Sequence, residues 1–198
     1  MHRRHVLLSA GALTLAFTSL AQANQAANAA EDFVATNIQA GFDILNDRAV
    51  GASARQQRFA DLLLGLTDVR RVALFLLGRY AADASAADLD AYVAAYQDYA
   101  LSIYRTYFQL YAGQSLKVVS SRERAPGDFI VTTNMAGGAP MEIDFRVRTD
   151  GAKPMLVDVA VSGVWLALAQ RDQFLATLAV NKGDIKALTA QLRALPSR

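Results

Sequence analysis

The chain contains no cysteine, and its two histidines, His2 and His5, both lie among the first residues. The rest of the sequence therefore cannot form a disulfide, a Ser-His-Asp or Cys-His catalytic triad, or one of the usual zinc sites. Long apolar runs are missing as well, because the stretches at residues 6–20 and 72–77 are both shorter than the ~20 residues of a membrane-spanning helix. These absences argue against several enzyme classes and against a membrane-spanning protein.

The first residues have the composition of an export signal. A basic pair, Arg3-Arg4, precedes the apolar stretch 6–20, and Ala21-Gln22-Ala23 matches the A-x-A pattern of a cleavage site. A second candidate site is Ala27-Asn28-Ala29. We therefore expect a signal peptide over residues 1–23, cleavage somewhere in 23–29, and export to the periplasm. The arginine pair is compatible with the Sec route and with the twin-arginine route.

Loss of this segment changes the charge of the chain. The formal net charge is +2, and it becomes zero in the mature protein because the segment holds Arg3 and Arg4 and no acidic residue. A neutral chain without runs of basic residues offers no basic face to nucleic acid and no polybasic patch to an anionic membrane. We expect no nucleic-acid partner. Residues 30–196 are sufficient for one domain with a substantial core.

Apolar residues recur at helical spacing through the first half of the mature chain, which predicts four helices. The first covers Glu31–Asp47, and the second follows a break at Gly51, carries Phe59, Leu62, Leu63 and Leu66, and stops near Thr67-Asp68. The third covers Val69–Tyr80, and the fourth runs from Ser85, which can cap against Asp88, to about Ala112. The third is apolar on all sides at its centre, so it is buried or lines an apolar cavity.

The pattern then changes to the alternation that is typical of strands. Strands are predicted at 116–122, 129–135, 141–148 and 155–162, and helices at 164–180 and 184–195 close the chain. The third strand alternates most clearly, with Met141, Ile143, Phe145 and Val147 on one face and charged residues on the other. Four consecutive strands with short links predict an antiparallel meander and an α+β fold class.

Several local patterns occur in a characteristic order. They are Phe59-x-x-Leu62, Phe75-x-x-Gly78-Arg79-Tyr80, Tyr104 and Tyr111 followed by Gly113-Gln114, Val157-Asp158-Val159-x-Val161-x-Gly163-Val164, Arg171-x-x-Phe174 and Leu188-x-x-x-Leu192. With this order and spacing the chain resembles the MlaC-type family, the periplasmic phospholipid-binding proteins also called toluene-tolerance auxiliary components. The resemblance covers roughly residues 31–195.

The resemblance implies a fold and a function. The fold is a helical layer packed on a four-stranded antiparallel sheet, with an apolar cavity between them that takes phospholipid acyl chains. The function is that of a monomeric, non-enzymatic carrier without metal or cofactor other than its bound lipid. Its partners would be an outer-membrane lipoprotein–porin complex and an inner-membrane ABC transporter with an MCE subunit, and it would serve the asymmetry of the outer membrane. Hopanoid-associated relatives share the architecture, so hopanoid is an alternative cargo.

The apolar residues of the sheet face and of the third helix either line this cavity or form an ordinary core. The resemblance favours cavity lining for some of them. The predicted lining residues are Leu74, Leu77, Tyr80, Tyr104, Val131, Met141, Ile143, Phe145, Val159, Val161 and Trp165. Arg79 and Arg171 either touch a lipid phosphate or pair with a carboxylate such as Asp158.

Two alternatives remain at the level of sequence. A carboxylate in an apolar pocket, Asp144 or Asp158, with Tyr104 as a donor, is the constellation that a pocket enzyme would use. Nothing in the spacing converges on a nucleophile or a metal, and Asp144 lies on the polar face of its strand, so no catalytic residue is assigned. A ligand-free periplasmic adaptor that uses the charged sheet face as an interface is the second alternative.

Overall fold

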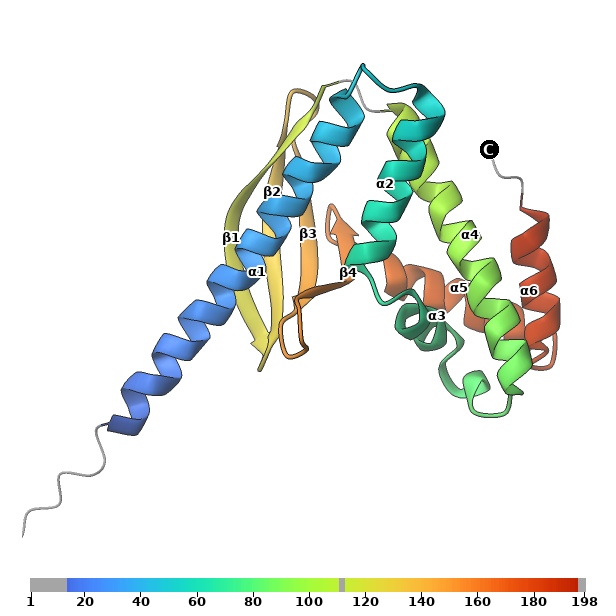
Figure 1. The fold of residues 1–198 in the computed structure, drawn as a ribbon. Helices are drawn as coiled ribbons and strands as arrows, with labels where there is room; N and C mark the ends of the chain where they lie inside the picture. The colour runs from blue at the N-terminus through green and yellow to red at the C-terminus, as the bar shows by residue number, and fades with distance from the viewer. Residues whose placement is uncertain (1–13, 111–112, 196–198) are drawn as a thin grey trace, which may run out of the picture.

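The computed structural model describes the backbone of residues 14–110 and 113–195, and the side chains of 25–103 and 113–195. Within these residues the fold is α+β, as the sequence predicts. A sheet with α1 (Thr14–Asn46) lying along it forms one half, and the remaining helices form the other half (Figure 1). None of the described helices is both long enough and apolar enough to cross a membrane.

The sheet is an antiparallel meander in the order β1-β2-β3-β4-β5. Its strands are β1 (Ser115–Ala125), β2 (Asp128–Ala136), β3 (Met141–Arg148), β4 (Met155–Val161) and β5 (Val164–Trp165). The fifth strand corrects the prediction of four strands and of a helix from Val164. Ser162 and Gly163 adopt positive φ angles of 50° and 81°, which turns the chain back so that Val164 pairs with Val161. The helix therefore begins at Leu166.

The alternation predicted for β3 is present in the sheet. Phe129 pairs with Val147 and Val131 with Phe145, so these side chains share one face, and α1 packs on that face. Ala30 of α1 is fully buried there. The helix begins at Thr14, well before the predicted start at Glu31.

The register of β4 shifts by one residue against β3. Arg146 pairs with Asp158, but the next residue, Val147, pairs with Leu156, which leaves Val157 as the extra residue of a bulge. Because a one-residue shift exchanges the two faces of a strand, Leu156 joins Val159 on the face that α1 covers.

The helical half contains α2 (Ala52–Leu66), α3 (Val69–Leu77), a 3-10 turn η1 (Gly78–Ala81), α4 (Ala86–Leu110), α5 (Leu166–Val180) and α6 (Ile185–Ala194). The predicted caps are present: the Asp68 carboxylate accepts a hydrogen bond from the Arg71 backbone nitrogen, and the Ser85 hydroxyl accepts one from that of Asp88. The α-helix of α3 ends at Leu77 rather than at Tyr80, because Gly78 has a φ of 54°.

The helices α3 to α6 enclose their own core, separate from the core between α1 and the sheet. Its largest fully buried side chains are Leu76, Leu77, Tyr92, Leu178 and Leu188. Phe174 of α5 packs edge-on against Tyr96 of α4, with ring centroids 6.4 Å apart. The two cores leave a region between them, and α2 lies over it (Figure 1).

Candidate functional site

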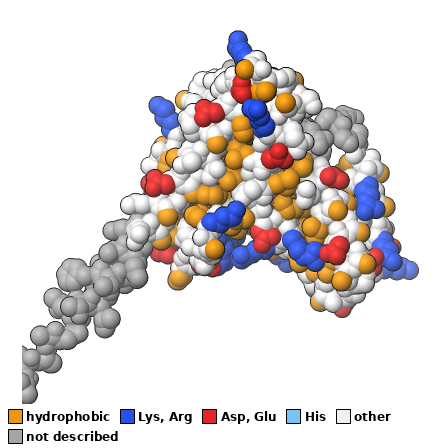
Figure 2. All heavy atoms as spheres, viewed as in Figure 1, with side chains coloured by type: hydrophobic (Ala, Val, Ile, Leu, Met, Phe, Trp, Pro, Cys, Tyr) orange, Lys and Arg blue, Asp and Glu red, His pale blue; other side chains and the backbone are white. Residues whose placement is uncertain are grey.

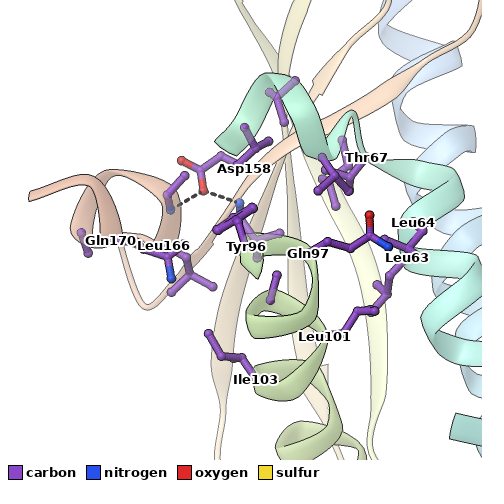
Figure 3. A pocket seen from close by; sticks show the side chains of 18 of the residues that line it. Leu63, Leu64, Thr67, Tyr96, Gln97, Leu101, Ile103, Asp158, Leu166 and Gln170 are labelled. Carbon is purple, nitrogen blue, oxygen red and sulfur yellow. Dashed lines mark hydrogen bonds between the residues drawn. The ribbon is translucent and has the colours of Figure 1, made fainter. Parts of the chain in front are cut away.

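A cavity of about 310 Å³ lies in this region, between α2, α3, α4, β4 and the start of α5. Most of its walls are aliphatic, as the close-up in Figure 3 shows. The lining residues are Leu63, Leu64, Thr67, Val69, Val72, Tyr96, Gln97, Ala100, Leu101, Ile103, Leu156, Val157, Asp158, Val159, Leu166, Ala167, Ala169, Gln170 and Gln173. We call this the large cavity.

A second cavity of about 180 Å³ lies between α1, α2 and the sheet. Its lining is apolar except for Asn37, whose side-chain amide donates a hydrogen bond to the Phe33 carbonyl oxygen at 2.7 Å. The other lining residues are Phe33, Val34, Ile38, Gly41, Phe42, Leu45, Phe59, Leu62, Leu63, Leu66, Leu116, Phe145 and Leu156. Leu63 and Leu156 line both cavities, so the two spaces adjoin. We call this one the small cavity.

The helix α2 forms one wall of both cavities. Its apolar residues Phe59, Leu62, Leu63 and Leu66 recur at helical spacing and therefore lie on one side of the helix. Yet no residue of α2 from Ala52 to Leu66 is fully buried. These four residues are only partly buried by other protein atoms, and an apolar face left partly open is typical of a surface that binds a ligand or a partner. Figure 2 shows hydrophobic side chains gathered along this part of the surface, between α1 and α4.

Among the described residues, Asp158 is the one acidic residue that lines the large cavity. Its carboxylate accepts hydrogen bonds from the backbone nitrogens of Val159 at 2.8 Å and Ala167 at 2.9 Å (Figure 3). Burial raises the pKa of Asp158, and these two bonds and the charge of Arg146 oppose the rise. Trp165, the N-cap residue of α5, makes no capping bond with its side chain, so Asp158 caps that helix from the neighbouring strand.

The arginines considered as partners of Asp158 lie elsewhere. The Arg171 guanidinium lies over the Phe75 ring, 4.5 Å from its centroid, and Arg79 donates a hydrogen bond to the Tyr80 hydroxyl at 3.2 Å. Among the described residues neither forms a salt bridge with Asp158. Neither arginine therefore pairs with Asp158, whose carboxylate accepts hydrogen bonds from backbone groups instead.

The structure brings only part of the predicted lining set to the cavities. Val159 lines the large cavity and Phe145 the small one. Met141, Ile143 and Val161 lie half-buried on the sheet face of Phe145, toward the β2–β3 turn. Leu77 and Val131 are fully buried in the two cores, and Leu74 packs against the helical core.

Three aromatic residues complete the predicted set. Tyr80 lies at the opposite end of the helical half, where it lines a polar depression with residues of the α5–α6 turn. Trp165 lies half-buried in β5, next to the lining residues Leu166 and Ala167. Tyr104 belongs to α4, but its side chain lies outside the described residues, as does Tyr111.

Several lining residues were not assigned a site role from the sequence. In the small cavity they come mainly from α1 and α2, whose apolar spacing predicted helices and no site role. In the large cavity many come from α4 and α5. The same spacing is the signal that could have placed these helices at an apolar wall. Leu156 gave no such signal, because its position depends on the bulge in β4.

The family comparison agrees with this geometry. The model of the MlaC protein family matches residues 35–194. The chain belongs to the MlaC family. The family predicted from the ordered sequence motifs is thereby confirmed. No curated protein gives a significant match.

The fold is shared with a solved structure of a phospholipid-binding protein from Ralstonia solanacearum, determined in complex with a phospholipid. The two superpose with a TM-score of 0.73 over 83% of this chain and 94% of the other, at 19% sequence identity. At this identity the likeness establishes a common fold. This member of the MlaC family thus has the α+β architecture that the sequence resemblance implied.

Proposed function

We propose that this MlaC-family protein is a periplasmic carrier that binds phospholipid by its acyl chains in the two adjoining cavities. The observation on which the proposal rests is the apolar face of α2, which lines both cavities and contains no fully buried residue. Family membership and the phospholipid in the structurally similar Ralstonia protein support the same ligand class.

The energetics of a lipid in water explain why such walls are needed. A two-chain lipid has on the order of 30 methylene groups, and at ~0.8 kcal/mol each their exposure to water costs about 24 kcal/mol. A carrier must therefore enclose the chains in apolar surroundings. Because a bilayer shelters the same chains equally well, loading and unloading are close to balanced, and the direction of transfer is set by the partners.

We propose as those partners an outer-membrane lipoprotein–porin complex and an inner-membrane ABC transporter with an MCE subunit. Export by the segment 1–23 places the carrier in the periplasm between them, where it serves outer-membrane lipid asymmetry. Apolar walls can also enclose the ring system of a hopanoid, so a hopanoid remains the second candidate cargo.

Lipid extraction tests the proposal directly. The protein is purified without detergent, extracted with organic solvent and analysed by mass spectrometry, and we expect about one phospholipid or hopanoid molecule per chain. The variant Ala100→Trp places an indole in the large cavity and should lose the lipid. Ala94→Trp, on an exposed position of the same helix, is the matched control and should keep it.

The alternatives give different results. A ligand-free adaptor would be isolated empty and would take up no labelled lipid. Its Ala100→Trp variant would bind the partner protein as well as the wild type does. A pocket enzyme would turn over a small substrate and lose that activity in Asp158→Asn. An empty protein that also fails to accept lipid from vesicles would disprove the carrier function.

A further inference from the structure

A third and smaller pocket, of about 150 Å³, adjoins the large cavity. Of its ten lining residues, five also line the large cavity, namely Val72, Leu156, Val157, Asp158 and Ala167. The other five are Asp68, Arg71, Phe75, Arg146 and Arg148. We call this space the arginine pocket. It lies on the polar side of β3 and thus gives the apolar cavity a charged neighbour.

Two of the three arginines are held in place by carboxylates, and among the described residues each of them keeps donors free. Arg146 donates from Nε and Nη2 to Asp128, at 2.9 and 2.8 Å, and its Nη1 is not used by these bonds. Arg148 likewise uses Nε and Nη2 for Asp150. A guanidinium has five N–H donors, so each side chain retains an N–H pair on Nη1 in a fixed position.

The third arginine has no such carboxylate partner. Arg71, in the first turn of α3, is exposed and forms no salt bridge within the part of the chain that the structure describes. The hydrogen bond from Arg148 lowers the pKa of the nearby Asp150 and the charge of Arg71 adds to this effect, but no described carboxylate is hydrogen-bonded to the Arg71 side chain. Its N–H donors are therefore left for an anion that enters the pocket, and the planar guanidinium suits the oxygens of a phosphate.

The two carboxylates of the pocket are already engaged. Asp68 accepts from the Arg71 backbone nitrogen at 3.0 Å and Asp158 from that of Ala167 at 2.9 Å. Both bonds are made at helix N-termini, those of α3 and α5, so these carboxylates are held by backbone N–H groups and not by the arginines. The pocket thus combines three guanidinium groups with two carboxylates that accept hydrogen bonds from backbone N–H groups.

We propose that the arginine pocket binds the phosphate group of the lipid whose chains occupy the cavities. The inference rests on the proposed carrier function and adds to it a recognition of the headgroup. Arg71 and the free donors of Arg146 and Arg148 hold the phosphate oxygens, while the shared residues connect the pocket to the apolar chains. The protein then selects phosphate-bearing lipids over neutral lipids with the same chains.

The experiment compares two fluorescent lipids with identical chains, a phosphatidylglycerol and a diacylglycerol, each titrated into delipidated protein. We expect the double variant Arg71→Gln/Arg148→Gln to bind phosphatidylglycerol at least ~10-fold more weakly, since hydrogen bonds to charged groups contribute ~1.5–3 kcal/mol, and diacylglycerol within about twofold of the wild type. Arg122→Gln, an exposed arginine of β1 outside the pocket, is the matched control. Arg146 is left unchanged because the buried Asp128 depends on it.

Every other outcome contradicts either the headgroup inference or the carrier function on which it rests. An equal loss for both lipids, or no loss for either, would show that the pocket does not recognise phosphate. A third outcome is that inorganic phosphate binds tightly to the delipidated protein and equally tightly to the protein loaded with phosphatidylglycerol. That result would identify a free-phosphate site instead. If the wild type takes up neither lipid, the carrier function itself fails, whereas wild-type binding of both lipids with equal affinity overturns only the headgroup role.

Discussion

The carboxylate of Asp158, on β4, accepts a hydrogen bond from the backbone nitrogen of Ala167, at the start of α5, over 2.9 Å. One side chain thereby joins the sheet to the helical half, caps a helix and forms part of the wall of the large cavity. Substitutions of Asp158 can separate the effect of its helix cap from the effect of its buried charge.

We expect Asp158→Ala to lower the free energy of unfolding by about 1 kcal/mol, the usual effect of losing a helix cap. Asp158→Asn keeps an acceptor oxygen and should be less destabilised. Burial raises the pKa of Asp158, so the folded state binds the proton more tightly than the unfolded chain. The wild type therefore loses stability as pH rises from the ordinary value of 3.8 to the raised pKa, and Asp158→Asn lacks this loss. Urea unfolding from pH ~4 to ~7 measures both effects, and a pH profile identical in both proteins would contradict the expectation.

Asp128 shows the opposite shift. Burial alone would raise its pKa, but the hydrogen bonds and charges of Arg146 and Arg124 outweigh burial and lower it. The resulting stabilisation is present above the ordinary value of 3.8 and is lost as pH falls through the lowered pKa. We expect Arg146→Gln to lower the free energy of unfolding by about 3 kcal/mol, because it removes a partner from a carboxylate that is 2% exposed.

The exposed pair of Arg70 and Asp90 provides the control for this network. Arg70→Gln removes a salt bridge of similar length, 2.6 Å, between side chains that are 51% and 65% exposed. Its effect should stay below about 1 kcal/mol. If Arg146→Gln and Arg70→Gln lower the free energy of unfolding equally, the burial of Asp128 does not strengthen its salt bridge.

Leu63 and Leu156 stand where the two cavities meet, so this junction should decide whether both chains of a lipid fit. We expect Leu63→Trp to abolish binding of a two-chain phospholipid while a single-chain lysophospholipid still binds in the large cavity. Leu168→Trp, at an exposed position of α5, should bind both lipids as the wild type does. Retained binding of the two-chain lipid by Leu63→Trp would mean that its chains do not cross the junction.

The packing of α1 distinguishes the two candidate cleavage sites. Ala26 and Ala27 pack against the core that contains Ala30, and Ala30 is fully buried. A protein that starts at Ala30 loses these contacts and places a charged amine beside the core, so it should be about 1–2 kcal/mol less stable than one that starts at Asn24. We therefore expect cleavage after Ala23, and intact-mass analysis of the exported protein checks it; an N-terminus at Ala30 would contradict the expectation.

The sequence predicted the sheet well where its pattern was unambiguous. The alternation of Met141, Ile143, Phe145 and Val147 placed β3 and its apolar face correctly. In β4 almost every residue from Met155 to Val161 is apolar, so no alternation could reveal the bulge at Val157. The fifth strand depends on a positive φ at Ser162, a conformation that serine seldom adopts and that the sequence does not signal.

The site was harder to predict than the fold. Leu77 and Leu63 are both leucines in apolar stretches of helices, yet one is fully buried in a core and the other lines two cavities. The difference arises from the spacing between whole helices, which long-range packing determines. Residue type and periodicity identify an apolar face, but they do not show whether protein or ligand covers it.

The sparse burial of α2 has a consequence for how cargo enters and leaves. The main contacts of this helix are with α1 and α4, so in the empty carrier it is the least anchored wall of the site. Bound hydrocarbon then completes the packing that the chain itself lacks, and the backbone amides of α2 should exchange with deuterium slowly in the loaded protein and quickly in the empty one. In the carrier proposed above, local opening of this helix would let the cargo in and out, and a partner that docks beside α2 would trigger release without deforming the sheet.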